Sequence, residues 1–199
     1  MEKKEYFAEV IESSLDNFLA QSWEWNCFPK FGSLVQVQSD QEIILGIVTQ
    51  IQTGSMDPMR YPFAYKKTEE ELLEEQPQIF EFLKTTFRVQ LCGHVPVCEA
   101  RIHYLLPSKP CKIHAFVKEA SQDLVSDFFN KPDFLHLLFA FGAQLCNLDE
   151  LLLAIFRQLS DKKLLGSEKL DSFCQTFSLL TGNDYRRLKL FLKRVEACF

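Results

Sequence analysis

FGSLVQVQSDQEIILGIVTQIQTG, residues 31–54, is the stretch that decides the fold of this chain. Two runs rich in β-branched residues, 34–37 and 43–51, flank a polar connector at 38–42. Apolar and polar side chains alternate within each run, and a connector of this kind is typical of a turn, so the stretch predicts a β-hairpin. Gly46 interrupts the second run, which predicts a bulge or a sharp bend in a closing sheet.

The hairpin lies at the centre of a predicted small β-barrel. Alternation of the same kind recurs in two segments before the hairpin and in two after it. These four segments are residues 6–11, 17–23, 87–92 and 97–106. Between them, Thr68 and Glu71 have the spacing of a capping box, and Pro77 predicts a kink. We therefore expect a six-stranded barrel over residues 1–107 with a helical insertion near 68–85.

The hydrophobic period changes from about two to about 3.6 after Pro107 and Pro110, which mark the predicted domain boundary. Residues 108–199 are then expected to be helical. Asn147 is a predicted N-cap, and Gly182 is a predicted helix-terminating glycine. The expected helices are 121–129, 134–141, 148–159, 167–182 and 183–199. The predicted fold class is α+β, a six-stranded barrel followed by an all-helical region.

Composition restricts the function classes. The chain has 199 residues, of which 47% are hydrophobic and 19 are phenylalanine, so a disordered chain is excluded. Its net charge of −5 argues against a general nucleic-acid binder, which needs a basic field. Seven cysteines without a CxxC pair are typical of a reducing compartment. Because no uncharged run reaches 18 residues, we expect no membrane span and a cytoplasmic location.

Three segments in the first 107 residues resemble the HAS barrel, the N-terminal β-barrel of HerA-type helicases and ATP synthase subunits. They are YFAEVI at 6–11, FGSLVQV at 31–37 and ILGIVTQI at 44–51, and a terminal strand before Pro107 completes the pattern. The whole chain also resembles short bacterial proteins in which such a barrel precedes a helical region, through residues 57–83 and 110–117.

The resemblance implies a role in contacts between proteins, because the barrel of the larger relatives mediates ring contacts and docking. In those relatives a P-loop ATPase follows the barrel. This chain has no GxxxxGK[ST] sequence, and Gly166-Ser167 lacks the lysine and the glycine spacing that cradle phosphates. We therefore expect neither nucleotide binding nor a cofactor.

A cysteine and histidine group is the candidate metal site. It consists of Cys92, His94, Cys98 and His103, with Cys111 and His114 nearby in sequence. Zinc is one interpretation, but the paired ligands from tight turns that structural zinc sites use are missing, so packed or surface residues are favoured. A Cys–His nucleophile of an unrecognised hydrolase is the least supported alternative. We expect a non-enzymatic protein.

Two further groups are candidates for partner binding. Trp23, Trp25, Phe28 and Phe31 crowd into one loop, where they either plug an end of the barrel or form an exposed patch. In the last helix, helical spacing puts one apolar stripe opposite a basic arc. The stripe is Tyr185, Leu188, Leu192, Val195 and Phe199, and the arc is Arg186, Lys189 and Lys193, with Arg187 and Arg194 further round.

The basic arc is interpreted as a solvated face, as a surface for an acidic partner protein, or as a nucleic-acid contact. The predicted partner-binding residues are Arg186, Arg187, Lys193, Arg194, Trp23 and Trp25. Our first hypothesis is an adaptor that uses the barrel and the helices to bind an unidentified protein. The alternative is an accessory nucleic-acid factor that acts through the barrel loops and the basic helix.

Overall fold

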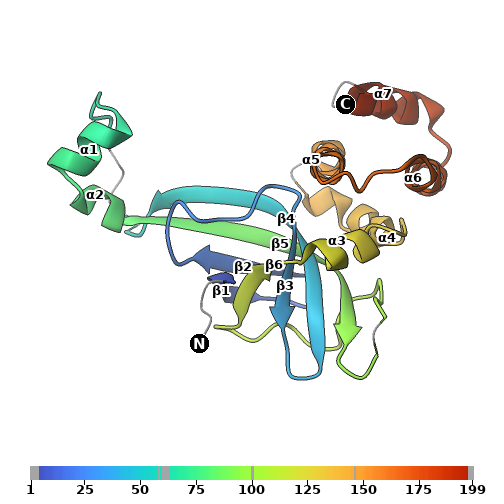
Figure 1. The fold of residues 1–199 in the computed structure, drawn as a ribbon, viewed down its shortest axis with the longest axis horizontal. Helices are drawn as coiled ribbons and strands as arrows, with labels where there is room; N and C mark the ends of the chain where they lie inside the picture. Colours follow the sequence, from blue (N-terminus) through green and yellow to red (C-terminus); the bar gives the residue numbers. More distant parts are fainter. Residues whose placement is uncertain (1–4, 58, 60–62, 100, 146, 197–199) are drawn as a thin grey trace.

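The computed structural model describes residues 5–57, 59, 63–99, 101–145 and 147–196 and contains a closed barrel of six strands (Figure 1). All neighbouring strands are antiparallel, in the order β1-β2-β5-β4-β3-β6. The strands are β1 Tyr6–Ser13, β2 Asn17–Ser22, β3 Leu34–Gln38, β4 Glu42–Ser55, β5 Leu83–Pro96 and β6 Phe116–Glu119. The α+β class and the barrel at the start of the chain are confirmed.

The central hairpin is confirmed as β3 and β4, with Leu34 opposite Ile47 and Val37 opposite Ile44. Strand β4 is buried on both faces along the barrel. Ile44 and Val48 belong to the cluster inside the barrel, whereas Leu45 and Ile47 belong to the cluster beneath the helices. A strand covered on both sides is apolar throughout, which explains the continuous ILGIV run.

The sixth strand was predicted at residues 97–106, and this prediction is wrong. The described residues of that range form no strand, although His103 pairs with His94 in an isolated bridge. The closing strand is β6, which pairs with both β1 and β3 and buries Val117 inside the barrel. The difference arises because alternation at 97–106 is not matched by burial, since Val97 and Leu105 are exposed. The barrel therefore closes beyond the predicted boundary at 107.

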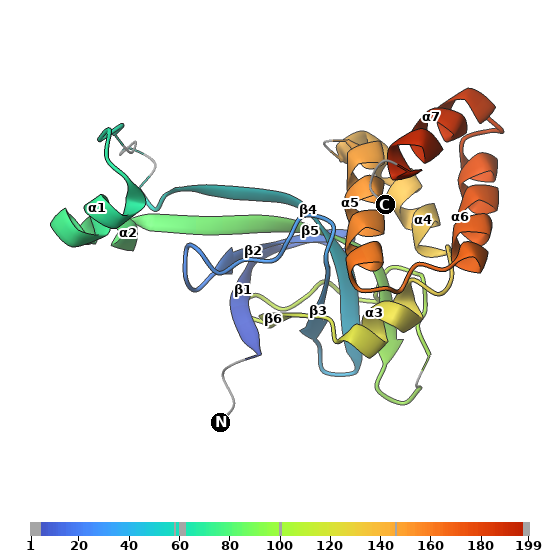
Figure 2. The ribbon, with the colours of Figure 1, turned by 45° about the horizontal axis from the view of Figure 1, so that its top comes forward.

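Strands β4 and β5 continue beyond the barrel as a long two-stranded arm, which we define as residues 52–86 (Figures 1 and 2). Its end carries α1, Glu69–Glu75, and α2, Gln78–Glu81. The capping box is confirmed, because the Thr68 hydroxyl accepts from the Glu71 N–H at 3.2 Å and the Glu71 carboxylate accepts from the Thr68 N–H at 2.8 Å. The helical insertion ends at Glu81, four residues before the predicted limit of 85, and residue 83 already pairs in β5.

The remaining helices lie at the opposite end of the barrel from the arm (Figure 2). They are α3 Gln122–Phe128, α4 Phe134–Ala140, the short 3-10 helix η1 Gly142–Gln144, α5 Leu148–Asp161, α6 Ser167–Leu180 and α7 Tyr185–Glu196. One apolar cluster joins Leu45, Ile47 and Cys92 of the barrel to Phe128 and Leu135 of the helices. The outer face of β4 and β5 is therefore the surface on which the helical region packs.

Candidate interaction sites

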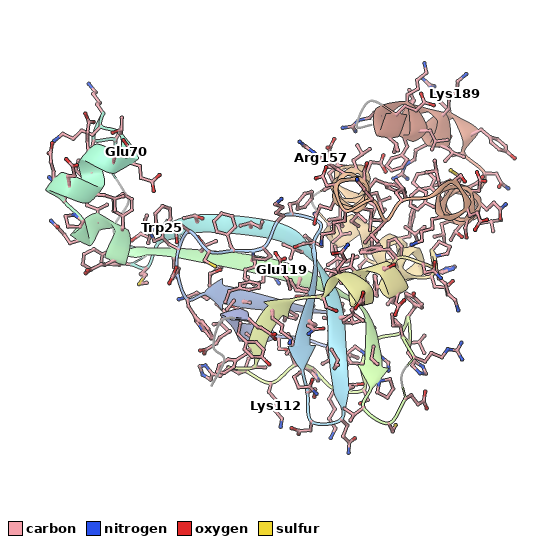
Figure 3. The ribbon with its side chains drawn as sticks, in the orientation of Figure 1. Trp25, Glu70, Lys112, Glu119, Arg157 and Lys189 are labelled. Atoms are coloured by element: carbon pink, nitrogen blue, oxygen red, sulfur yellow. The ribbon has the colours of Figure 1, made fainter. Side chains whose placement is uncertain are left out.

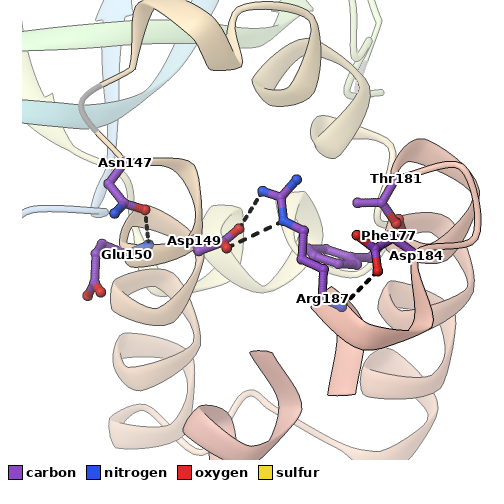
Figure 4. Close-up of polar contacts among 7 residues, drawn as sticks. All are labelled: Asn147, Asp149, Glu150, Phe177, Thr181, Asp184 and Arg187. Atoms are coloured by element: carbon purple, nitrogen blue, oxygen red, sulfur yellow. Dashed lines mark hydrogen bonds and ion pairs between the residues drawn. The ribbon is translucent and has the colours of Figure 1, made fainter. Parts of the chain in front are cut away.

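The structure divides the basic residues of α7 into two sets. Arg187 reaches Asp149 at the start of α5, with its Nη2 at 2.6 Å from one carboxylate oxygen (Figure 4). Arg194 pairs with Glu150 at 2.5 Å. The Arg187 guanidinium also lies over the rings of Phe139 and Phe177, 5.9 and 5.7 Å from their centroids. These two arginines therefore link α7 to α5 through ion pairs.

The second set is exposed. Arg186, Lys189 and Lys193 lie on one face of α7 together with Leu190, which is 55% exposed, and Lys189 points away from the bundle in Figure 3. Residues separated by three, four and seven positions share a helix face. Within the described part of the chain, these three cations form no ion pair. They are the free cations of the predicted basic arc.

The apolar stripe of the last helix was predicted incorrectly. Phe191 and Val195 are buried and Leu188 is packed against them, but Leu192 is only half-buried and Tyr185 is 72% exposed. Phe199 lies outside the described residues. The helix is rotated because Phe191 stacks on Phe177, with centroids 5.3 Å apart. The large ring of Phe191 fills the space between the helices, so Phe191 is buried in preference to Leu192.

Arg187→Glu is expected to lower the free energy of unfolding by about 1–2 kcal/mol, because it removes a two-point ion pair and a ring contact and puts two carboxylates together. Both partners are about one-third exposed, so water limits the effect. Arg186→Glu on the exposed face should change the free energy of unfolding by less than about 0.5 kcal/mol. Urea unfolding of the two variants measures these changes. Equal unfolding midpoints would show that the ion pair between Arg187 and Asp149 does not stabilise the protein.

The arm exposes both apolar and acidic side chains. Met59 is 88% and Phe63 80% exposed, and Met56, Leu73 and Phe82 are also exposed. Neither α1 nor α2 has a buried residue. Two lysines and six glutamates lie within residues 63–82, so this part of the arm is acidic. The glutamates are visible in the sequence, but their place on an arm is not.

The loop aromatics do not plug the barrel. Trp23 and Phe28 are each 43% exposed, and Phe31 packs against the helical cluster instead. Trp23 contacts the ring of Phe116 edge-on at 5.4 Å and donates its indole N–H to Glu9 at 3.0 Å.

Trp25, by contrast, supports the arm. Its ring stacks on Phe80 with centroids 5.4 Å apart, and its carbonyl accepts a hydrogen bond from the Thr85 hydroxyl. The two tryptophans thus lie on different surfaces, Trp23 on the barrel near β6 and Trp25 beside the arm.

The cysteine and histidine candidates are not assembled into one site. His94 and His103 stack with ring centroids 5.5 Å apart, and His103 lies 2.9 Å from Glu99. Cys92 and Cys111 lie in different apolar clusters, and Cys98 is exposed. His114 instead lies 3.2 Å from Glu9. Among the described residues, no three His, Cys, Asp or Glu side chains are grouped so that they could hold a metal ion.

The buried thiols have the wrong chemistry for a nucleophile. Burial raises the pKa of Cys111 to about 12 and the pKa of Cys92 well above its usual range. The Cys92 Sγ donates to the Gln90 carbonyl at 3.5 Å. Both thiols are therefore protonated at neutral pH, whereas the attacking species in cysteine chemistry is the thiolate.

Comparison with known families agrees with the barrel geometry. The model of the HAS barrel domain matches residues 7–95, a range that includes β2 to β4 and nearly all of β1 and β5. Residues 7–95 are therefore similar to the HAS barrel domain. The match ends before β6, so the strand that closes the HAS-like barrel comes from the segment that leads into the helices. No curated protein matches the sequence. Among the described residues, no helix has the length and apolarity needed to cross a membrane.

Proposed function

We propose that this chain is a non-enzymatic adaptor that binds another protein through the arm of its HAS-like barrel. The arm is formed by the extended ends of β4 and β5, and it projects away from both the barrel and the helices (Figure 2). Its two helices add nothing to either apolar cluster of the protein. Ordering these helices costs conformational entropy, and burial in the core of the protein does not offset that cost, which favours a role in binding.

One observation carries this proposal: several large apolar side chains are exposed on the arm. Single exposed apolar residues are common on protein surfaces and need no explanation. Here Met56, Met59, Phe63, Leu73 and Phe82 all lie within residues 56–82. Grouped apolar side chains rimmed by charge are typical of surfaces that bind other proteins.

The charge of the arm indicates the kind of partner. Glu69, Glu70 and Glu74 form no ion pair within the described residues, whereas Glu75 pairs with Lys67. A partner with a basic and apolar surface would complement these residues. Nucleic acid is less well supported, because the arm is acidic and Arg187 and Arg194 are neutralised by α5.

The test is affinity capture from native lysate with a variant that removes the apolar surface, Phe63→Ser/Leu73→Ser/Phe82→Ser. We expect it to lose a partner that the unchanged protein captures, with an unaltered melting temperature, because these side chains are exposed. The matched control is Val97→Ser/Leu105→Ser/Leu179→Ser, which changes three exposed apolar residues outside the arm. Capture that is lost with the control but kept with the arm variant would contradict the proposal.

A further inference from the structure

We infer that the arm of one molecule binds α7 of a second copy of this chain. The inference rests on the proposed function and names the partner of the arm. It follows from two exposed helix faces of opposite charge, one on α1 and one on α7, each with three like charges and one leucine. Glu70 and Lys189 mark the two faces in Figure 3.

The first face is on α1. Glu69, Glu70, Leu73 and Glu74 lie one, three and four positions apart, so they share one side of the helix. All four are exposed, and Leu73, between the glutamates, is 48% exposed. The other two glutamates of α1 make contacts within the arm, because Glu71 completes the capping box and Glu75 pairs with Lys67.

The second face is on α7, where Arg186, Lys189 and Lys193 lie beside Leu190. The open groove beside this face measures about 730 Å³. Leu190 and Phe191 are among the residues that line it. Each face therefore has one exposed leucine beside three like charges, negative on α1 and positive on α7.

The two faces cannot meet within one molecule, because the arm and α7 lie at opposite ends of it (Figures 1 and 2). Between molecules, three glutamates would face three cations while Leu73 packs on Leu190. Such a contact joins two different surfaces of identical chains, so it is heterologous. A pair joined by one such contact keeps one free arm and one free α7, so association continues into a ring or a linear oligomer.

Sedimentation velocity of the full chain at about 50 mM and about 500 mM salt tests this, because screening of exposed charges weakens such a contact. The arm variant is Glu69→Lys/Glu70→Lys/Glu74→Lys, and the α7 variant is Arg186→Glu/Lys189→Glu/Lys193→Glu. We expect the unchanged protein to associate at low salt and each variant to be a monomer, with its affinity weakened by about 100-fold.

Mixing the two variants gives the sharpest result. The arm of the α7 variant and the α7 of the arm variant are both unchanged, and the reversed arm and the reversed α7 carry opposite charges. Both contacts can therefore form between the two variants, and the mixture should associate as the unchanged protein does. A variant with both sets of reversals should associate again, because the charges are exchanged. The control Lys131→Glu/Arg157→Glu/Lys162→Glu makes the same charge change at exposed residues of the helical region and should associate normally.

A monomeric unchanged protein at low salt overturns the inference, and so does a mixture that stays monomeric. If that monomeric protein still loses its lysate partner on Phe63→Ser/Leu73→Ser/Phe82→Ser, the second copy is excluded but the proposed adaptor function stands. If neither association nor capture depends on the arm, both proposals fail.

Discussion

Phe177→Ala is expected to lower the free energy of unfolding by about 3–5 kcal/mol, the largest effect that we predict for a single substitution. Phe177 is fully buried in α6. Its ring lies 5.3 Å from Phe191, 5.5 Å from Phe139 and 5.7 Å from Phe173, so it contacts three other rings. Truncation to Ala leaves a cavity between helices that the surrounding rings are too rigid to fill.

Urea unfolding followed by circular dichroism measures this loss, and Leu179→Ala is the matched control. Leu179 lies two residues further along α6 and is exposed, so its truncation removes little buried area. We expect it to change the free energy of unfolding by less than about 0.5 kcal/mol. Equal losses for the two variants would show that α6 does not pack through the Phe177 side.

The same aromatic cluster explains why the face of the last helix was predicted incorrectly. Apolar spacing alone favours a stripe centred on Leu192, since Leu188 and Val195 fit it. The alternative set of Leu188, Phe191 and Val195 has equally good spacing. The choice between them depends on the rings of Phe156, Phe173 and Phe177, which come from other helices and cannot be located from the local sequence.

Predictions of the barrel succeeded where the pattern was long and failed where it was short. The β3–β4 hairpin has many alternating residues, and its register follows from them. Strand β6 has four residues, and of these Val117 alone is buried, so alternation has too few positions to be recognised. The projecting end of β4 was missed for a related reason, because Gln52 and Thr53 cover no core and resemble loop residues.

The sequence predicts which residues belong to the candidate site, but it does not predict which residues they contact. The basic residues of α7 are visible in the sequence, yet nothing local distinguishes Arg187 from Arg186. The ion-pair partner of Arg187 is Asp149, which is 38 positions away. Likewise, the capping box of α1 was predicted correctly, whereas its position at the end of an arm depends on pairing between β4 and β5.

Gly46→Ala is expected to lower the free energy of unfolding by about 1–3 kcal/mol, because the barrel has no space for the added methyl group. A Cβ at this position would lie 2.4 Å from Val89 Cγ1 and 2.9 Å from the Gln90 carbonyl oxygen. The register of β4 and β5 shifts between Leu45 and Gly46, so the predicted irregularity is present. The close approach of β5 at this point is what requires glycine.

Gly54→Ala provides a matched control in the same strand. Gly54 pairs with Lys84 on the arm, and an added Cβ would meet no atom within 4 Å. Both substitutions reduce the freedom of the unfolded chain equally, and this effect alone favours the folded state by about 0.4–1 kcal/mol. Any difference between them in thermal or urea unfolding therefore reports the clash at Gly46. If Gly46→Ala is as stable as Gly54→Ala, Val89 and the Gln90 carbonyl move aside at no cost, and the barrel does not need glycine where β4 bends.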